Sequence, residues 1–190
     1  MFYISYLGLL IAFILFLYRN KELSTNYTLA FFYLFNSIFG IVHNVLFSSS
    51  NPTAIAIFTN HFMPFYFLVG PSLFYFIKRT YISDKKTIYD YLHGIPFWLV
   101  FINVSPYIFS PWAEKIEYAN QILHHSNNQY EVKFLFMSSI WQSVLRPFIN
   151  IVYGIVCFYI YLLHYDKRIF KVKKMNDAFC WWVGVFLFIF

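Results

Sequence analysis

Apolar residues fill long uninterrupted segments of this 190-residue chain, and charged residues gather in short stretches between them. Segment 23–77 contains no Asp, Glu, Lys or Arg and has room for two membrane-crossing helices, since one crossing takes about 20 residues. The sequence Ser48-Ser49-Ser50-Asn51-Pro52 is typical of a turn and divides this segment. The pattern predicts an all-α fold, a polytopic helical membrane bundle of five full transmembrane helices plus a partial sixth. The predicted spans are about 2–18, 27–47, 54–77, 92–110, 140–163 and 178–190.

The two ends of the chain differ in what they predict. Segment 2–18 has no Lys or Arg before it, unlike a secretory signal, so we expect it to be a retained first span. Segment 178–190 is short for a crossing and stands last in the sequence. We therefore expect these 190 residues to be one truncated transmembrane domain, a fragment that precedes a cytoplasmic domain.

Basic residues are distributed unevenly among the predicted loops. The first, third and fifth loops hold eleven Lys and Arg, and the second and fourth hold two. Loops that face the cytoplasm carry an excess of Lys and Arg. The distribution predicts a chain in the bacterial inner membrane with its N-terminus outside and its odd-numbered loops in the cytoplasm.

Composition supports the membrane class. Hydrophobic residues make up 60% of the chain and charged residues 12%, against about 25% charged in a soluble domain. This excludes an ordinary cytosolic enzyme, a disordered chain and a basic protein that coats nucleic acid. The formal net charge of +6 is explained by the cytoplasmic loops and the anionic lipid that they face.

Polar residues inside the predicted spans are the candidate ligand site. Ionisable and amide side chains are costly in hydrocarbon, so each needs a reason. Helical rise places them in the outer half of the bilayer, where they form a pocket with Arg146 as the contact for an anion. The alternative is that Arg146 extends to the lipid headgroups and the amides join helices. The candidate ligand-binding residues are His43, Asn44, His61, Asn103, Gln142, Arg146 and Asn150.

Motifs for catalysis are missing from the sequence. It contains no glycine-rich phosphate loop, no His-Glu-x-x-His and no serine nucleophile elbow. The predicted spans also contain no carboxylate for proton coupling. We therefore predict that the chain is not an enzyme, with no catalytic residues, no metal and no cofactor.

One stretch of the chain matches a family pattern. The third span ends Gly70-Pro71-Ser72-Leu73-Phe74-Tyr75 before a basic loop, and the next opens His93-Gly94-Ile95-Pro96-Phe97. This resembles the N-terminal membrane domain of bacterial membrane-bound AraC-type transcriptional regulators. The resemblance implies a helix break at Gly70 and Pro71 and an inner-boundary position for His93. Prolines also kink helices, so Pro71 and Pro96 are the hinge candidates; routine tolerance of proline in bundles is the alternative.

The resemblance also implies a function. In that family, the membrane helices precede a cytoplasmic helix-turn-helix domain that binds DNA, and this chain lacks that domain. We therefore expect a sensor domain in which a ligand shifts a kinked bundle between two packings. The alternatives are a small transport or channel component and a nonfunctional truncated fragment. The expected partners are the lipid bilayer, a small extracytoplasmic ligand and, as a homodimer, a second copy, with no direct nucleic-acid binding.

Overall fold

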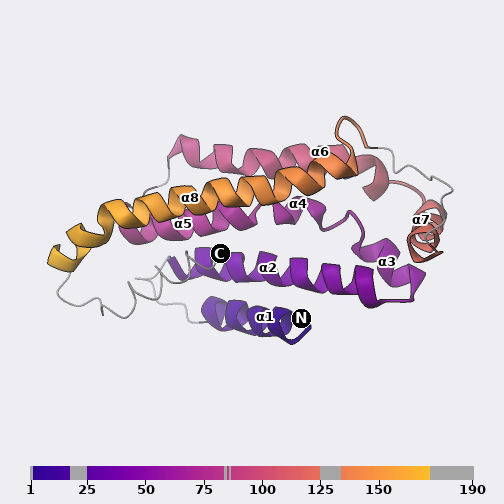
Figure 1. The fold of residues 1–190 in the computed structure, drawn as a ribbon, viewed down its shortest axis with the longest axis horizontal. Coiled ribbons are helices and arrows are strands. Elements are labelled where there is room, and N and C mark those ends of the chain that lie inside the picture. Colours follow the sequence, from indigo (N-terminus) through magenta and orange to yellow (C-terminus); the bar gives the residue numbers. More distant parts are fainter. Residues whose placement is uncertain (1, 18–24, 84, 86, 125–133, 172–190) are drawn as a thin grey trace.

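A computed structural model of the protein describes residues 2–17, 25–83, 85, 87–124 and 134–171 (Figure 1). The described residues are helical or lie in turns and connections, which confirms the all-α class for this part of the chain. The predicted sixth span, 178–190, lies outside the described residues. The helices are α1 (Phe2–Leu17), α2 (Thr25–Ser48), α3 (Pro52–Phe58), α4 (Met63–Tyr66), α5 (Val69–Tyr81), the 3₁₀-helix η1 (Ile88–Gly94), α6 (Ile95–Ile108), α7 (Trp112–His124) and α8 (Ser139–Lys171).

Fewer helices than predicted could cross a membrane on their own. Within the described residues, α2 and segment Ile140–Leu163 of α8 are long and apolar enough. Two bent helix pairs raise the number to four if each pair is one span. One pair is bent by 52° and the other by 101°. Helix α1 is apolar but has only 16 residues. The structure therefore supports two to four spans and a membrane location, and the count of five stays a prediction.

The predicted third span, 54–77, is divided into α3, α4 and α5, and stays a prediction as a single crossing. Helix α3 ends at Phe58, because Thr59 adopts an extended conformation with ψ of 132°. Asn60 follows with a positive φ of 59°, which Asn tolerates better than most residues. Pro64 then stands in the first turn of α4, where a missing N–H costs little. Local backbone chemistry therefore divides this segment, which can be one span only as a bent helix pair.

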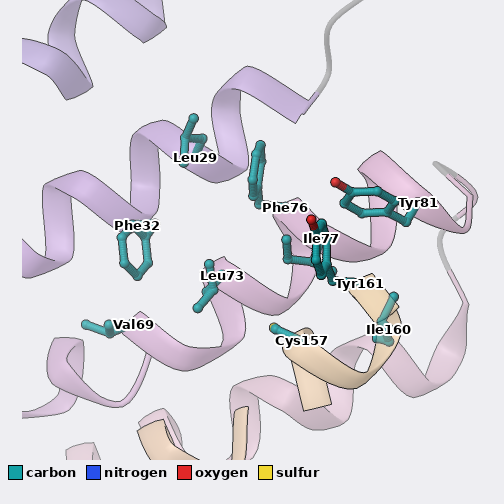
Figure 2. Close-up of a cluster of buried hydrophobic side chains, with 10 residues drawn as sticks. All are labelled: Leu29, Phe32, Val69, Leu73, Phe76, Ile77, Tyr81, Cys157, Ile160 and Tyr161. Atoms are coloured by element: carbon teal, nitrogen blue, oxygen red, sulfur yellow. The ribbon is translucent and has the colours of Figure 1, made fainter. Parts of the chain in front are cut away.

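Helix α5 lies between α2 and α8 and forms the main core with them (Figures 1 and 2). Large aliphatic and aromatic side chains from the three helices interlock, and Leu73, Ile77 and Cys157 are fully buried. The free thiol of Cys157 is therefore a small packing group. The ten residues of this cluster are Leu29, Phe32, Val69, Leu73, Phe76, Ile77, Tyr81, Cys157, Ile160 and Tyr161.

Small residues hold α1 against α2. A Cβ added at Gly8 would overlap the hydroxyl of Ser37, and one added at Gly40 would overlap the hydroxyl of Ser5. Ala12 is buried in the same interface side of α1. Small residues let two helix backbones approach closely in lipid, where there is no hydrophobic force to join them.

Helix α7 was not predicted, because its charged residues indicated an outer loop, the fourth predicted loop at 111–133. Pro111 starts it: the carbonyl of Pro111 accepts from the N–H groups of Glu114 and Lys115. The apolar side of α7 packs through Ala119 on α3, where Ile55 is fully buried. The segment is thus a helix bent sharply away from α6 rather than a free loop.

Helix α8 has one face toward the bundle and one face away from it. Gln142 and Cys157 are fully buried, while Phe148, Ile151 and Ile155 are exposed. An apolar exposed face along a long helix fits lipid rather than water. Gln142 of α8 therefore points at the bundle and Arg146 is half-buried, and this orientation builds the candidate site.

Candidate functional site

Arg146 of α8 lies over two aromatic rings inside the bundle. Its guanidinium carbon is 4.7 Å from the ring centre of Phe39 on α2 and 5.3 Å from that of Tyr66 on α4. The side chain is half-buried. Ring faces attract a cation but do not neutralise its charge. No carboxylate or hydrogen-bond acceptor pairs with this guanidinium among the described residues.

The break between α3 and α4 faces the same place. Thr59 is buried, and its hydroxyl has no hydrogen-bond partner. The side-chain nitrogen of Asn60, the residue with positive φ, also lacks one. A buried polar group without a partner costs free energy, and such groups and strained backbone concentrate at functional sites.

These groups line a cavity of about 110 Å³, which we call the Arg146 cavity. Its walls come from α2, α3, the break, α4 and α8. His43 is exposed and lies at its edge, beside Phe39 and Phe47 with ring centres 5.9 and 4.4 Å away. The lining residues are Phe39, Val42, His43, Leu46, Phe58, Thr59, Asn60, Met63, Tyr66 and Arg146.

His61 does not line the Arg146 cavity, although the sequence grouped them. Its Nε2 lies 3.4 Å from the Nζ of Lys115 on α7, and its ring contacts Tyr107 on α6. Lys115 is only 8% exposed and donates to the carbonyl of Ile108 at 2.7 Å. Tyr107 in turn donates to the carbonyl of Ala56. His61 thus belongs to a cluster that joins α6 and α7 to α3.

Asn103 and Gln142 also lie away from the cavity, and both hold a backbone segment. Asn103 is fully buried: its amide donates to the carbonyl of Met137 at 2.8 Å and accepts from the N–H groups of Phe136 and Met137. Gln142 donates to the same carbonyl at 3.2 Å. The Oε1 of Gln142 is buried without a hydrogen-bond partner. The bonds that Asn103 and Gln142 do make support the alternative interpretation of the amides, in which they join elements of the fold.

Asn44 and Asn150 each retain one unpartnered polar atom. The Nδ2 of Asn44 and the Oδ1 of Asn150 are buried without a hydrogen-bond partner. The other amide atom of Asn44 accepts from Ser48 at 3.0 Å. Neither residue lines the Arg146 cavity. Of the seven predicted ligand-binding residues, the structure therefore brings only His43 and Arg146 together there.

The residues of the family-like motif meet at a different point. A Cβ added at Gly70 would lie 2.9 Å from the ring carbon Cγ of Tyr153 on α8. The Tyr153 hydroxyl is 2.7 Å from the Nδ1 of His93, whose ring also contacts Phe74 at 4.5 Å. We call Gly70, His93 and Tyr153 the Tyr153 junction. It joins α5, η1 and α8 by close packing and one hydrogen bond.

The two hinge prolines lie near helix starts. Pro71 stands in the first turn of α5, and Pro96 stands in the first turn of α6 just after η1. The helix boundary thus falls just before Gly70, close to the expected break. Proline at these positions costs no intrahelical bond, so both mark boundaries rather than kinks within a helix. Pro106 and Pro147 are the prolines inside described helices.

One ion pair joins the end of α5 to η1. Lys78 is 2.5 Å from a carboxylate oxygen of Asp90, and the other oxygen accepts from the N–H of Thr87. Burial alone would raise the pKa of Asp90, but these bonds and the charge of Lys78 outweigh it and lower the pKa. Asp90 is therefore ionised at neutral pH.

The sequence reading missed Tyr153 and Lys115. Tyr153 follows Arg146 by seven residues, which places both on one helix face, so this spacing could have identified it. Lys115 precedes Ile116 and Ala119 on a helix whose apolar side was visible in the sequence.

Comparisons of the chain with protein families, with curated proteins and with solved structures give no match.

Proposed function

We propose that these residues form the membrane sensor domain of a membrane-bound AraC-type transcriptional regulator and that the Arg146 cavity takes a small anionic ligand. The DNA-binding part of such a regulator would lie outside the 190 residues. The observation that carries the ligand site is a guanidinium held over a cavity without a counter-charge among the described residues. The family assignment rests on the motif around Gly70, Pro71, His93 and Pro96.

The chemistry of the cavity favours a compact anion. Arg presents a planar set of donors that matches a carboxylate or phosphate. The hydroxyl of Thr59 and the amide of Asn60 supply further unpartnered polar atoms at the helix break. Broken membrane helices commonly place ligand sites at such breaks. A volume of about 110 Å³ limits the ligand to a few heavy atoms.

Binding has a route to the rest of the bundle. Arg146 and Tyr153 are on the same helix, and Tyr153 packs on Gly70 of α5. An anion that draws Arg146 toward the break would bias how α8 sits against α4 and α5. A ligand shifts a conformational equilibrium only by its differential affinity for the two states. The sensor proposal therefore needs two packings of α8, one of which binds the anion better.

The proposed membrane arrangement keeps the topology that the sequence predicts. The N-terminus is outside, and α1, α2, the two bent pairs and α8 supply five crossings, with 178–190 as the predicted partial sixth. Its support is the concentration of Lys and Arg in the odd-numbered loops. Protease digestion of a terminal tag on sealed, right-side-out cells measures this: a protected N-terminal tag would contradict it.

The ligand site is tested by thermal unfolding of the detergent-solubilised chain with formate, acetate or sulfate added. A ligand that binds only the folded state stabilises it, so at least one of these anions should raise the unfolding temperature of the unsubstituted protein. Arg146→Leu should abolish the rise, and Arg146→Lys should keep part of it. Lys171→Leu, which removes an equal charge at the end of α8, is the matched control.

A rise that is equal in Arg146→Leu would show that the anions act elsewhere. In the intact regulator, a reporter gene gives the second measurement. Arg146→Leu should remove the response to an active anion while the protein level stays unchanged. An unchanged response would refute the sensor role of the cavity.

A further inference from the structure

The wall of the Arg146 cavity is mostly apolar. The side chains of Val42, Leu46, Phe58 and Met63 line it, in addition to the two rings that Arg146 lies over. Val42 is only 3% exposed, and the other three side chains pack on the same core cluster. Such a wall offers no hydrogen bond to a ligand, but covering it with hydrocarbon is favourable.

The polar groups of the cavity are few, and they match a single negative charge. Among the described residues that line it, Arg146 is the only Lys, Arg, Asp or Glu. The hydroxyl of Thr59 and the side-chain nitrogen of Asn60 add neutral groups without hydrogen-bond partners. A monovalent anion neutralises the guanidinium, whereas a divalent anion leaves a net negative charge against an apolar wall, which is costly.

A carboxylate fits these donors better than a tetrahedral anion does. The N–H donors of a guanidinium lie in one plane, where two of them match the two oxygens of one carboxylate. Asn60 and Thr59 can donate to the lone pairs that remain. Sulfate and phosphate carry oxygens on all sides, so some of these oxygens would face the apolar wall without a hydrogen bond.

The volume of the cavity limits the length of the ligand. One water molecule takes up about 30 Å³, so about 110 Å³ holds roughly four groups of that size. We propose that the Arg146 cavity selects a short-chain monocarboxylate, with the carboxylate on Arg146 and the hydrocarbon chain on the apolar wall. This inference rests on the proposed anion site and names the class of ligand that it takes.

A series of small anions tests the ligand class on the unsubstituted, detergent-solubilised chain. The shift of the unfolding temperature with ligand concentration gives an apparent dissociation constant for each anion. The series is measured near pH 8, where carboxylic acids are ionised and histidine side chains are ordinarily neutral. From formate through acetate to propionate, binding should tighten about fourfold per added carbon, the factor for one buried CH₂ group. Beyond butyrate it should tighten no further, because the volume is filled.

Four other probes separate the charge from the chain. Nitrate, which is planar and monovalent but has no hydrocarbon, should bind like formate. Sulfate and phosphate should bind more weakly than propionate. Propionamide, which has the shape of propionate without its charge, should not bind.

The outcomes separate this inference from the function on which it rests. Equal binding of formate and propionate, or binding of sulfate or phosphate as tight as that of propionate, would overturn the ligand class. If Arg146→Leu abolished that binding, the anion site itself would still stand. If no anion stabilised the chain through Arg146, the proposed function would fail together with the ligand class.

A variant of the apolar wall gives the second test. Val42→Ala removes two methyl groups from the wall, so butyrate should gain relative to propionate. Val100→Ala is the matched control, because Val100 is equally buried in the same core cluster but does not line the cavity. The order of ligands is compared within each variant, so a lower stability of the variant does not affect the result. The same order in Val42→Ala and in the original chain would contradict a hydrocarbon chain on this wall.

Discussion

The Arg146 cavity and the Tyr153 junction lie two helical turns apart on α8, yet they are built in opposite ways. At the junction, Tyr153 has a hydrogen-bond partner in His93 and fills the space above Gly70. At the cavity, the hydroxyl of Thr59 has no partner, and open volume remains. Close packing fixes the position of a helix. Where polar groups lack partners beside free volume, a bound ligand can fix the position instead.

The largest expected effect comes from filling the junction. Gly70→Ala places a methyl group 2.5 to 3.0 Å from three carbon atoms of Tyr153, including its Cβ, which the side chain cannot move away by rotation. Overpacking of this kind costs about 1–3 kcal/mol. We expect a clear fall in the unfolding temperature of the solubilised protein.

The control for that prediction is Gly94→Ala. A Cβ at Gly94 meets no atom within 4 Å, and its φ of −84° suits any residue. This variant should unfold close to the original temperature. If both alanine variants unfolded alike, the junction would not be the tight contact that the structure describes.

A smaller effect should follow loss of the hydrogen bond at the junction. Tyr153→Phe keeps the ring over Gly70 but removes the hydroxyl that lies 2.7 Å from His93. Loss of a hydrogen bond costs about 1 kcal/mol. A double-mutant cycle with His93→Ala measures the coupling by chemical denaturation. Additive effects of the two substitutions would show that the bond contributes nothing.

The smallest effect should occur at the cavity, where Thr59→Val removes a hydroxyl that has no partner. The side chains have nearly the same shape, and the buried hydroxyl is unsatisfied in the folded state. We expect an unfolding free energy that is unchanged or slightly higher. A fall in the unfolding free energy of about 1 kcal/mol or more would show that this hydroxyl has a partner. The cavity would then not differ from the junction in this respect.

Much of the fold could be predicted, because the length of an apolar segment and the charge of a loop are visible along the sequence itself. Segments 27–47 and 140–163 lie within α2 and α8, and the turn at Ser48–Pro52 is where α2 gives way to α3. The break at Thr59 and Asn60 carries no charge, so the pattern did not show it. Charged residues in α7 hid a helix for the opposite reason.

The candidate site was predicted only in part. Depth along a helix axis follows from residue number, and it correctly suggested that His43 and Arg146 lie close together. The direction in which a side chain points around that axis depends on which helices pack together. His61 and Asn103 share the predicted depth but face α7 and the 134–137 segment. Sequence periodicity on single helices does not fix that rotation.

Helix α8 has a mechanical consequence. Its 33 residues make a rod of about 50 Å, while the hydrocarbon layer is about 30 Å thick. Pro147, next to Arg146, removes one backbone hydrogen bond of α8, so the helix bends most easily at the cavity. A tilt of a few degrees at this point moves the far end of α8 by several ångströms. A small change at the cavity is thereby amplified at the other end of the helix.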